Sequence, residues 1–397
     1  MTTSTSSIST QTSNPQDAAI RLLCRHGLHQ LLWLPETSKH PKLRVTFSTT
    51  SNFEDASLPA ILHAGPMFGT RYGAVEFDAL ARECGVRVIC VDRYGLTSKY
   101  ADERIIDNSR PGFGGSTPVS IDIRMAVWLE TVPALLQRLG LKHISLMTHS
   151  AGGIYTLNTL LRHRSLLDPR NPYVAFMAAY VPMTDSGATL PNIASHIPTT
   201  LVDSWSTVAG FINTKIMPAS SWSGGALSAS ASFLTSPFGT NAGDSASSST
   251  TPEERYGVDK ETAKCIADLS MKYMSAESIV GANEEAKLCL RKCEDADWGD
   301  AADYAACITK IGEREGELQD QPKLRIDGFF AGSDVMIGKQ GQEFFERCWQ
   351  SDEVARHVDF ESRTYEKTDH DSLILDYKKG ALRDVFKRVA ELSGKQT

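Results

Sequence analysis

Short apolar runs alternate with amphipathic stretches along much of this 397-residue chain. Each apolar run has the length of a β-strand, and the stretches between them space their apolar residues as helices do. This strand–helix–strand rhythm predicts a parallel sheet with helices on both faces. The expected strands are 28–34, 43–49, 60–63, 86–92, 143–148, 173–181, 324–331 and 357–366, and the expected helices are 72–84, 121–139, 151–163, 341–350 and 372–392.

The rhythm stops after Pro182 and resumes near residue 324. Residues 186–252 are rich in Ser, Gly, Thr and Pro, and residues 253–315 have the pattern of charged helices. An independent helical domain would explain this break, but the flanking strands complete one another, which favours an insertion. We therefore predict the α/β class: a mostly parallel eight-stranded sheet flanked by helices, built from 28–185 and 319–397, with an inserted helical cap at 186–318 and a disordered tail at 1–27.

Charge and composition exclude several classes of partner. The formal net charge is −7, which provides no basic stripe for nucleic acid and no polybasic face for anionic lipid. The Ser/Thr-rich start of the chain lacks the apolar core of a secretory signal, and no run approaches the roughly 20 apolar residues that span a bilayer. We expect a soluble protein without a nucleic-acid partner or stable membrane insertion, and the oligomeric state stays open.

The eight cysteines do not form a known metal-binding pattern. Cys289 and Cys293 are one helical turn apart and Cys307 follows, but no histidine in that stretch completes a zinc spacing. Reduced cysteines that pack helices together are the favoured interpretation. We expect no metal or cofactor, and a reducing, cytoplasmic compartment.

A candidate nucleophile lies where the fifth expected strand meets a helix. The sequence there is THSAGG, residues 148–153. A serine on a sharp strand-to-helix turn needs small neighbours, and the helix N-terminus stabilises negative charge nearby. Ser150 is therefore the candidate, although Thr148 replaces the first glycine of the usual G-x-S-x-G pattern. A helix-capping turn without chemistry is the alternative.

The loop after the third expected strand is the candidate oxyanion loop. It reads HAGPMFGTR at residues 63–71. In a hydrolase built on such a turn, this loop supplies one oxyanion N–H and the residue after the nucleophile, here Ala151, supplies the other. Gly65 is the first candidate in the loop and Met67 the second, because Pro66 has no N–H. His63 is expected to be structural.

Two late residues complete a possible catalytic triad. Asp334 follows an apolar strand, and His370 lies between a strand and the last helix. The order Ser, Asp, His along the chain is the one found in enzymes of the α/β class whose serine lies on such a strand-to-helix turn. Neutral His370 would take the serine proton, while Asp334 would fix its tautomer and stabilise the imidazolium. Asp185, past the preceding strand, is the alternative acid.

Taken together, these motifs resemble the α/β-hydrolase family, in its esterase, lipase and peroxidase-like branch, over residues 40–182 and 320–395. RPGFGGS at 110–116 is similar to the family's turn after the fourth strand. The resemblance implies a serine hydrolase acting on an ester, thioester or lactone of a small apolar molecule, with 186–318 as a cap over the site. Ser150 argues against epoxide hydrolases and haloalkane dehalogenases, which use a carboxylate there. An acyltransferase, a cofactor-free peroxidase or a non-catalytic ligand-binding homologue stays possible.

One interruption departs from the family pattern. The family turn reads Asp-Arg-Pro-Gly, but here the residues from Tyr94 to Arg110 separate Asp92 and Arg93 from Pro111. Without that segment the turn would be continuous. A surface loop beside the site and a translated, unspliced intron in the gene model both explain the segment, and the arginine at both ends motivates the second explanation.

Overall fold

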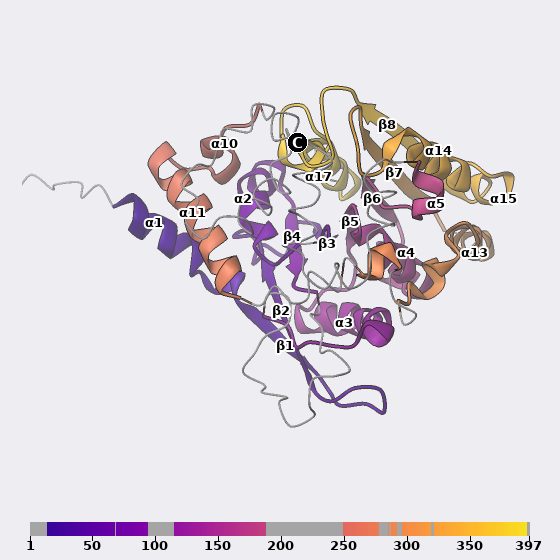
Figure 1. Ribbon diagram of the computed structural model, residues 1–397, viewed down its shortest axis with the longest axis horizontal. Coiled ribbons are helices and arrows are strands. Elements are labelled where there is room, and N and C mark those ends of the chain that lie inside the picture. Colours follow the sequence, from indigo (N-terminus) through magenta and orange to yellow (C-terminus); the bar gives the residue numbers. More distant parts are fainter. Residues whose placement is uncertain are drawn as a thin grey trace, which may run out of the picture.

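The computed structural model describes residues 14–67, 69–93, 115–187, 249–277, 285, 287–291, 296–318 and 321–394. These residues form one eight-stranded sheet in the order β1-β2-β4-β3-β5-β6-β7-β8 (Figure 1). The pairs β1–β2 and β2–β4 are antiparallel and the others are parallel, so the predicted sheet is confirmed. The strands are β1 Gln30–Leu34, β2 Leu43–Thr49, β3 Ala60–Ala64, β4 Arg87–Val91, β5 Ser145–His149, β6 Tyr173–Met177, β7 Leu324–Ala331 and β8 Val358–Tyr365.

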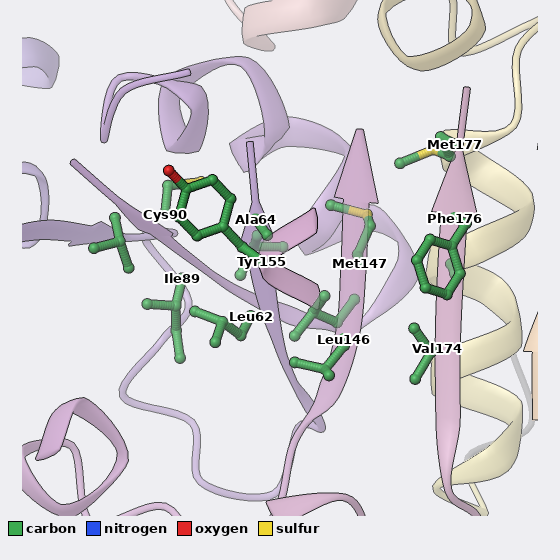
Figure 2. Packing of buried hydrophobic residues seen from close by; sticks show 14 of the residues in the cluster. Leu62, Ala64, Ile89, Cys90, Leu146, Met147, Tyr155, Val174, Phe176 and Met177 are labelled. Atoms are coloured by element: carbon green, nitrogen blue, oxygen red, sulfur yellow. The ribbon is translucent and has the colours of Figure 1, made fainter. Parts of the chain in front are cut away.

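The central strands are apolar on both faces because helices cover both faces. All five residues of β3, β4 and β6 are buried, and so are four of the five in β5. Figure 2 shows labelled side chains of this core, among them Leu62, Leu146 and Phe176, on neighbouring strands. Burial on both faces accounts for the continuous apolar runs in the sequence. The edge strand β1 instead alternates, with Leu32 and Leu34 buried and Trp33 exposed.

The helices form two layers on opposite sides of the sheet (Figure 1). On one side α2 and α17 meet through the edge-to-face rings of Phe77 and Phe386, and on the other α3 and α4 meet through Trp128 and Tyr155. The helices are α1 Pro15–Leu23, α2 Gly73–Cys84, α3 Arg124–Arg138, α4 Gly152–Arg162, α5 Met183–Ser186, α10 Pro252–Tyr256, α11 Lys260–Ala276, α13 Tyr304–Glu317, α14 Gly338–Trp349, α15 Asp352–Ala355, α16 Ser372–Leu375 and α17 Leu382–Leu392, with 3₁₀ turns at His26–Leu28, Ile121–Ile123, Arg164–Leu166 and Gly299–Ala302.

Two expected helices differ from the structure in detail. The helix expected at 121–139 starts as a 3₁₀ turn, and the one expected at 372–392 is divided into α16 and α17. The division occurs because Asp376 accepts the N–H groups of Lys378 and Lys379, which turns the chain. Any side chain at Gly380 would collide with the carbonyl oxygens of residues 372 and 376, so the turn requires a glycine.

The predicted disordered tail at 1–27 is wrong for residues 15–27. Helix α1 forms there, with its first turn capped by the Asn14 side chain, and a 3₁₀ turn follows it. Ala19 and Leu23 on one face of α1 are fully buried where α1 packs beside α11 (Figure 1). The apolar face of α1 is covered by a helix some 240 residues later in the chain, a contact that the local sequence does not reveal. Residues 1–13 lie outside the described part.

The segment between β6 and β7 contains helices and no strand among its described residues. Helix α10 packs on α2, and α13 packs on α4, α14 and α15. This agrees with the expected helical character, while the role of 186–318 as a cap stays a prediction. In the described part of the chain, no helix combines the length and apolarity that crossing a bilayer requires. Cys289 and Cys307 are buried and free, as expected of packing residues, and Cys293 lies outside the described residues.

Candidate active site

The sharp turn expected at Ser150 is present between β5 and α4. Ser150 has φ of 53°, in the left-handed region that L-residues other than glycine seldom occupy. Three hydrogen bonds hold it there. Its N–H donates to the carbonyl of Met177 on β6 at 3.1 Å, and its carbonyl accepts from the N–H groups of Gly153 at 2.9 Å and Tyr180 at 3.1 Å. Strain sustained in this way is typical of functional turns.

The two glycines after the turn have different roles. A Cβ on Gly152 would overlap the carbonyl oxygen of Ala64 and would lie 2.6 Å from both the Gly65 carbonyl oxygen and the Thr148 hydroxyl. A Cβ on Gly153 would meet nothing closer than 3.7 Å. Only Gly152 is therefore required for the turn to pack against the loop after β3.

The predicted acid and base are in contact. The Nδ1 atom of His370 lies 2.9 Å from the Oδ2 atom of Asp334, and both side chains are buried. The other oxygen of Asp334 accepts the backbone N–H groups of Met336 at 2.8 Å and Ile337 at 2.9 Å. The carboxylate is thereby fixed in orientation, so it can hold His370 in the tautomer that leaves Nε2 free to accept a proton.

The charges around this pair shift both pKa values toward the ionised forms. Burial disfavours the His370 imidazolium, but Asp334, with Asp371 and Asp369, outweighs burial and raises the pKa of His370 from 6.5 to about 9. Burial likewise disfavours the Asp334 carboxylate, yet His370 and the two backbone N–H groups lower its pKa below the ordinary value. The Asp334 carboxylate can therefore stabilise the imidazolium that His370 forms when it accepts a proton.

Asp185, the alternative acid, lies elsewhere. It belongs to the short helix α5, and its carboxylate accepts the hydroxyl of the neighbouring Thr184 at 2.9 Å. The structure brings Asp334, and not Asp185, to His370. The geometry is therefore consistent with the prediction from the sequence that the acid follows the seventh strand.

Sequence reasoning missed His149, which connects the strand-to-helix turn at residues 148–153, hereafter the elbow, to His370. Its Nε2 donates to the backbone carbonyl of His370 at 2.9 Å, and the two rings are 4.9 Å apart. Burial, with the nearby charge of His370, lowers the pKa of His149 to about 3, so this ring is neutral. Only its position directly before Ser150 could have indicated the role.

One group of residues in this region has the spacing of metal ligands. Single donor atoms of His149, His370 and Asp371 all lie within 4.8 Å of one another. One nitrogen of each ring already has a hydrogen-bond partner: His149 bonds the His370 carbonyl and His370 bonds Asp334. These two bonds fix the orientation of both rings.

The candidate oxyanion loop is fixed by hydrogen bonds to its carbonyl groups. Thr148 donates its hydroxyl to the carbonyl of Ala64 at 3.2 Å, and Arg93 donates to the carbonyl of Gly65 at 2.6 Å and to that of Pro66. Ala151 is the N-cap residue of α4, so its own N–H has no acceptor within that helix. The N–H groups of Ala151 and Gly65 thus belong to two segments in contact, while Met67, the second candidate, lies further along the loop.

The described residues on either side of the interruption after β4 contact one another. The side chain of Asp92 accepts the N–H of Gly115 at 3.1 Å, and the Ser116 hydroxyl donates to the backbone carbonyl of Asp92 at 2.7 Å. The segment from Tyr94 to Arg110 lies outside the described residues. Asp92, before the segment, is thus in contact with Gly115 and Ser116, after it.

The segment between β6 and β7 brings two glutamates to this region. Glu277 forms an ion pair with Arg71, which also binds Asp92 at 2.6 Å. Glu285 is buried and pairs with Arg93 at 3.1 Å and Arg124 at 2.6 Å. Arg71 ends the candidate oxyanion loop and keeps Asp92 as a second acidic partner, whereas Arg93, which binds the start of the loop, takes its counter-charge from Glu285 in the inserted segment.

Comparison with known proteins yields structural likeness only. No family model matches the sequence, and no curated protein does. A “putative lipase (lip1)” from Acinetobacter baumannii AYE is similar in structure, with a TM-score of 0.52 and 12% identity over 96% of this chain and 98% of that one. Carboxylesterase CesB from Bacillus subtilis gives a TM-score of 0.47 and 14% identity over 96% and 97% of the two chains.

The order of the strands in the sheet and the turn at Ser150 agree with this structural similarity. The sheet begins with an antiparallel pair, continues in parallel, and carries a strained serine between β5 and the helix that follows. Asp334 and His370, which are hydrogen-bonded to each other, follow the ends of β7 and β8. The chain has the α/β-hydrolase fold.

Proposed function

We propose that this protein is a serine hydrolase that cleaves an ester, thioester or lactone of a small, apolar molecule. The observation that carries the proposal is the buried hydrogen bond between Asp334 and His370, beside the strained turn at Ser150. His149 supports it, because this residue precedes Ser150 and bonds the backbone of His370. A bare helix-capping turn would need neither contact.

The reaction follows from the roles of these groups. Ser150 Oγ attacks the substrate carbonyl carbon while His370 Nε2 takes the hydroxyl proton, and the carbonyl electron pair moves onto the oxygen. The N–H groups of Ala151 and Gly65 stabilise that oxyanion. His370 then protonates the leaving group, and water, activated by the same histidine, releases the acid from Ser150. No cofactor is needed for this sequence.

An activated serine can be tested with a fluorophosphonate probe. We expect the purified protein to react with one equivalent of probe, with loss of fluoride and formation of a phosphonate ester at Ser150. Peptide mass spectrometry after digestion identifies the modified residue. A well-folded protein that stays unlabelled, or a label on another serine, would contradict the proposal.

The rate of hydrolysis should rise with pH, because only neutral His370 can accept the Ser150 proton. Since Asp334 raises the pKa of His370 to about 9, kcat/KM should keep increasing above the ordinary histidine value of 6.5. The measurement is kcat/KM for p-nitrophenyl butyrate from about pH 6 to about pH 10, corrected for spontaneous hydrolysis.

Asp334→Asn tests the cause of that shift. Removing the carboxylate charge should move the inflection to lower pH and reduce the plateau rate about 10⁴-fold, because the histidine loses both its counter-charge and its tautomer. A profile altered by Asp185→Asn and unaffected by Asp334→Asn would contradict the choice of acid.

A further inference from the structure

Thr148 stands where the usual elbow pattern has glycine. Its side chain is fully buried, at the end of β5. The register of β3 and β5 pairs Thr148 with Ala64, and the threonine hydroxyl donates to the Ala64 carbonyl at 3.2 Å. The hydroxyl also lies next to Gly152, where a Cβ would be 2.6 Å from it. The side chain is thus enclosed between the elbow and the loop after β3.

That hydrogen bond determines the direction of a neighbouring N–H. The carbonyl of Ala64 and the N–H of Gly65 belong to one planar trans peptide, in which the two groups point in opposite directions. A donor that holds the carbonyl therefore also holds the N–H. Gly65 is the residue whose N–H we assign to the oxyanion hole.

The next peptide is held by a second side chain. Arg93 donates to the Gly65 carbonyl at 2.6 Å, and its guanidinium is buried, paired with Glu285 and placed over the Tyr155 ring. The peptide planes on both sides of Gly65 are therefore each anchored at their carbonyl oxygen. Glycine has no side chain to restrict its own rotation, so these two bonds replace the missing restriction.

We propose that Thr148 is a positioning residue that orients the Gly65 N–H toward the oxyanion. This inference rests on the proposed function. A donor fixed before the reaction need not reorganise when negative charge develops on the substrate oxygen, and such fixed donors are a major source of rate enhancement. The threonine that departs from the usual pattern thus has a catalytic consequence without touching the substrate.

Thr148→Val tests the role because valine keeps the shape and removes the hydroxyl. We expect kcat for p-nitrophenyl butyrate to fall about 10- to 100-fold with KM changed less than about threefold, less than the loss of a whole oxyanion donor. Thr148→Ser should restore most of the rate, since it keeps the donor. The matched control is Thr156→Val on α4, whose buried hydroxyl has no hydrogen-bond partner in the described structure; it should keep the wild-type rate.

A trifluoromethyl ketone separates positioning from a merely structural role. Ser150 adds to its carbonyl, the proton passes to His370, and the resulting hemiketal oxygen occupies the oxyanion hole. Its inhibition constant should rise in Thr148→Val by the same factor by which kcat/KM falls, while the pH at the inflection of the rate profile stays unchanged. A structural defect would lower the melting temperature without this proportionality.

The outcomes distinguish this inference from the function on which it rests. Wild-type kcat and an unchanged inhibition constant in Thr148→Val, in an enzyme whose activity needs Ser150, would overturn the role of Thr148 alone. Failure of serine to restore the rate would also overturn it. A wild-type protein that reacts with neither probe nor ester would overturn both proposals.

Discussion

Ser150→Ala should lower kcat for ester hydrolysis by about 10⁵- to 10⁶-fold, the loss expected when a serine nucleophile is removed from an intact triad. The reason is chemical: alanine has no atom that can form the acyl-enzyme. KM should change little, because the groups that bind the substrate are untouched. The measurement is steady-state hydrolysis of p-nitrophenyl butyrate at a pH above the inflection of the wild-type profile.

Folding is the necessary control for this variant. Alanine and serine meet the same restriction at φ of 53°, so the melting temperature should stay close to that of the wild type. Ser145→Ala, at the start of the same strand, should keep full activity, because nothing in the described structure connects that residue to the site. Wild-type turnover in Ser150→Ala would show that another group carries the reaction.

Gly152→Ala should have the second large effect. The added methyl group would overlap the Ala64 carbonyl oxygen and crowd that of Gly65, both of which are backbone atoms. The elbow and the loop after β3 must then separate, at a cost of about 3 kcal/mol or more. Because the two oxyanion donors belong to these two segments, kcat should fall at least about 100-fold even in protein that still folds.

Gly153→Ala is the matched comparison, one residue away. Its methyl group would have no neighbour closer than 3.7 Å, and alanine is preferred over glycine in a helix by roughly 1 kcal/mol. Thermal denaturation and labelling of both variants should therefore give opposite results, with stability retained or raised for Gly153→Ala and lost for Gly152→Ala. Equal stability and equal labelling of the two variants would show that the close packing of Gly152 against the loop after β3 is not required for the site.

The sequence predicted those parts of the molecule in which the local pattern of apolar and polar residues follows directly from the place of the element in the fold. The buried strands are continuous apolar runs because both faces are covered. Ser150, Asp334 and His370 follow the ends of strands in the order this fold uses, and the structure brings Asp334 and His370 into contact. Their assignment as catalytic residues stays a prediction until the variants are measured.

What the sequence could not predict depends on contacts between distant segments. Helix α1 has an ordinary amphipathic pattern, and its stability becomes evident only when α11 covers it. Thr148 counted against the elbow as a departure from the pattern, yet its hydroxyl binds the loop beside it. Glu285 carries no signal of its own, because the arginines that it neutralises are more than 160 residues earlier in the chain.

The two buried ion pairs of Glu285 limit how this protein can be modified by recombination. If the segment between β6 and β7 were replaced with that of another protein of this fold, Arg93 and Arg124 would remain buried without their carboxylate, which costs several kcal/mol. A successful graft would have to carry a carboxylate at the place of Glu285 or replace both arginines at the same time. Point substitutions within the segment, which leave the ion pairs of Glu285 in place, should therefore be tolerated better than exchange of the whole segment.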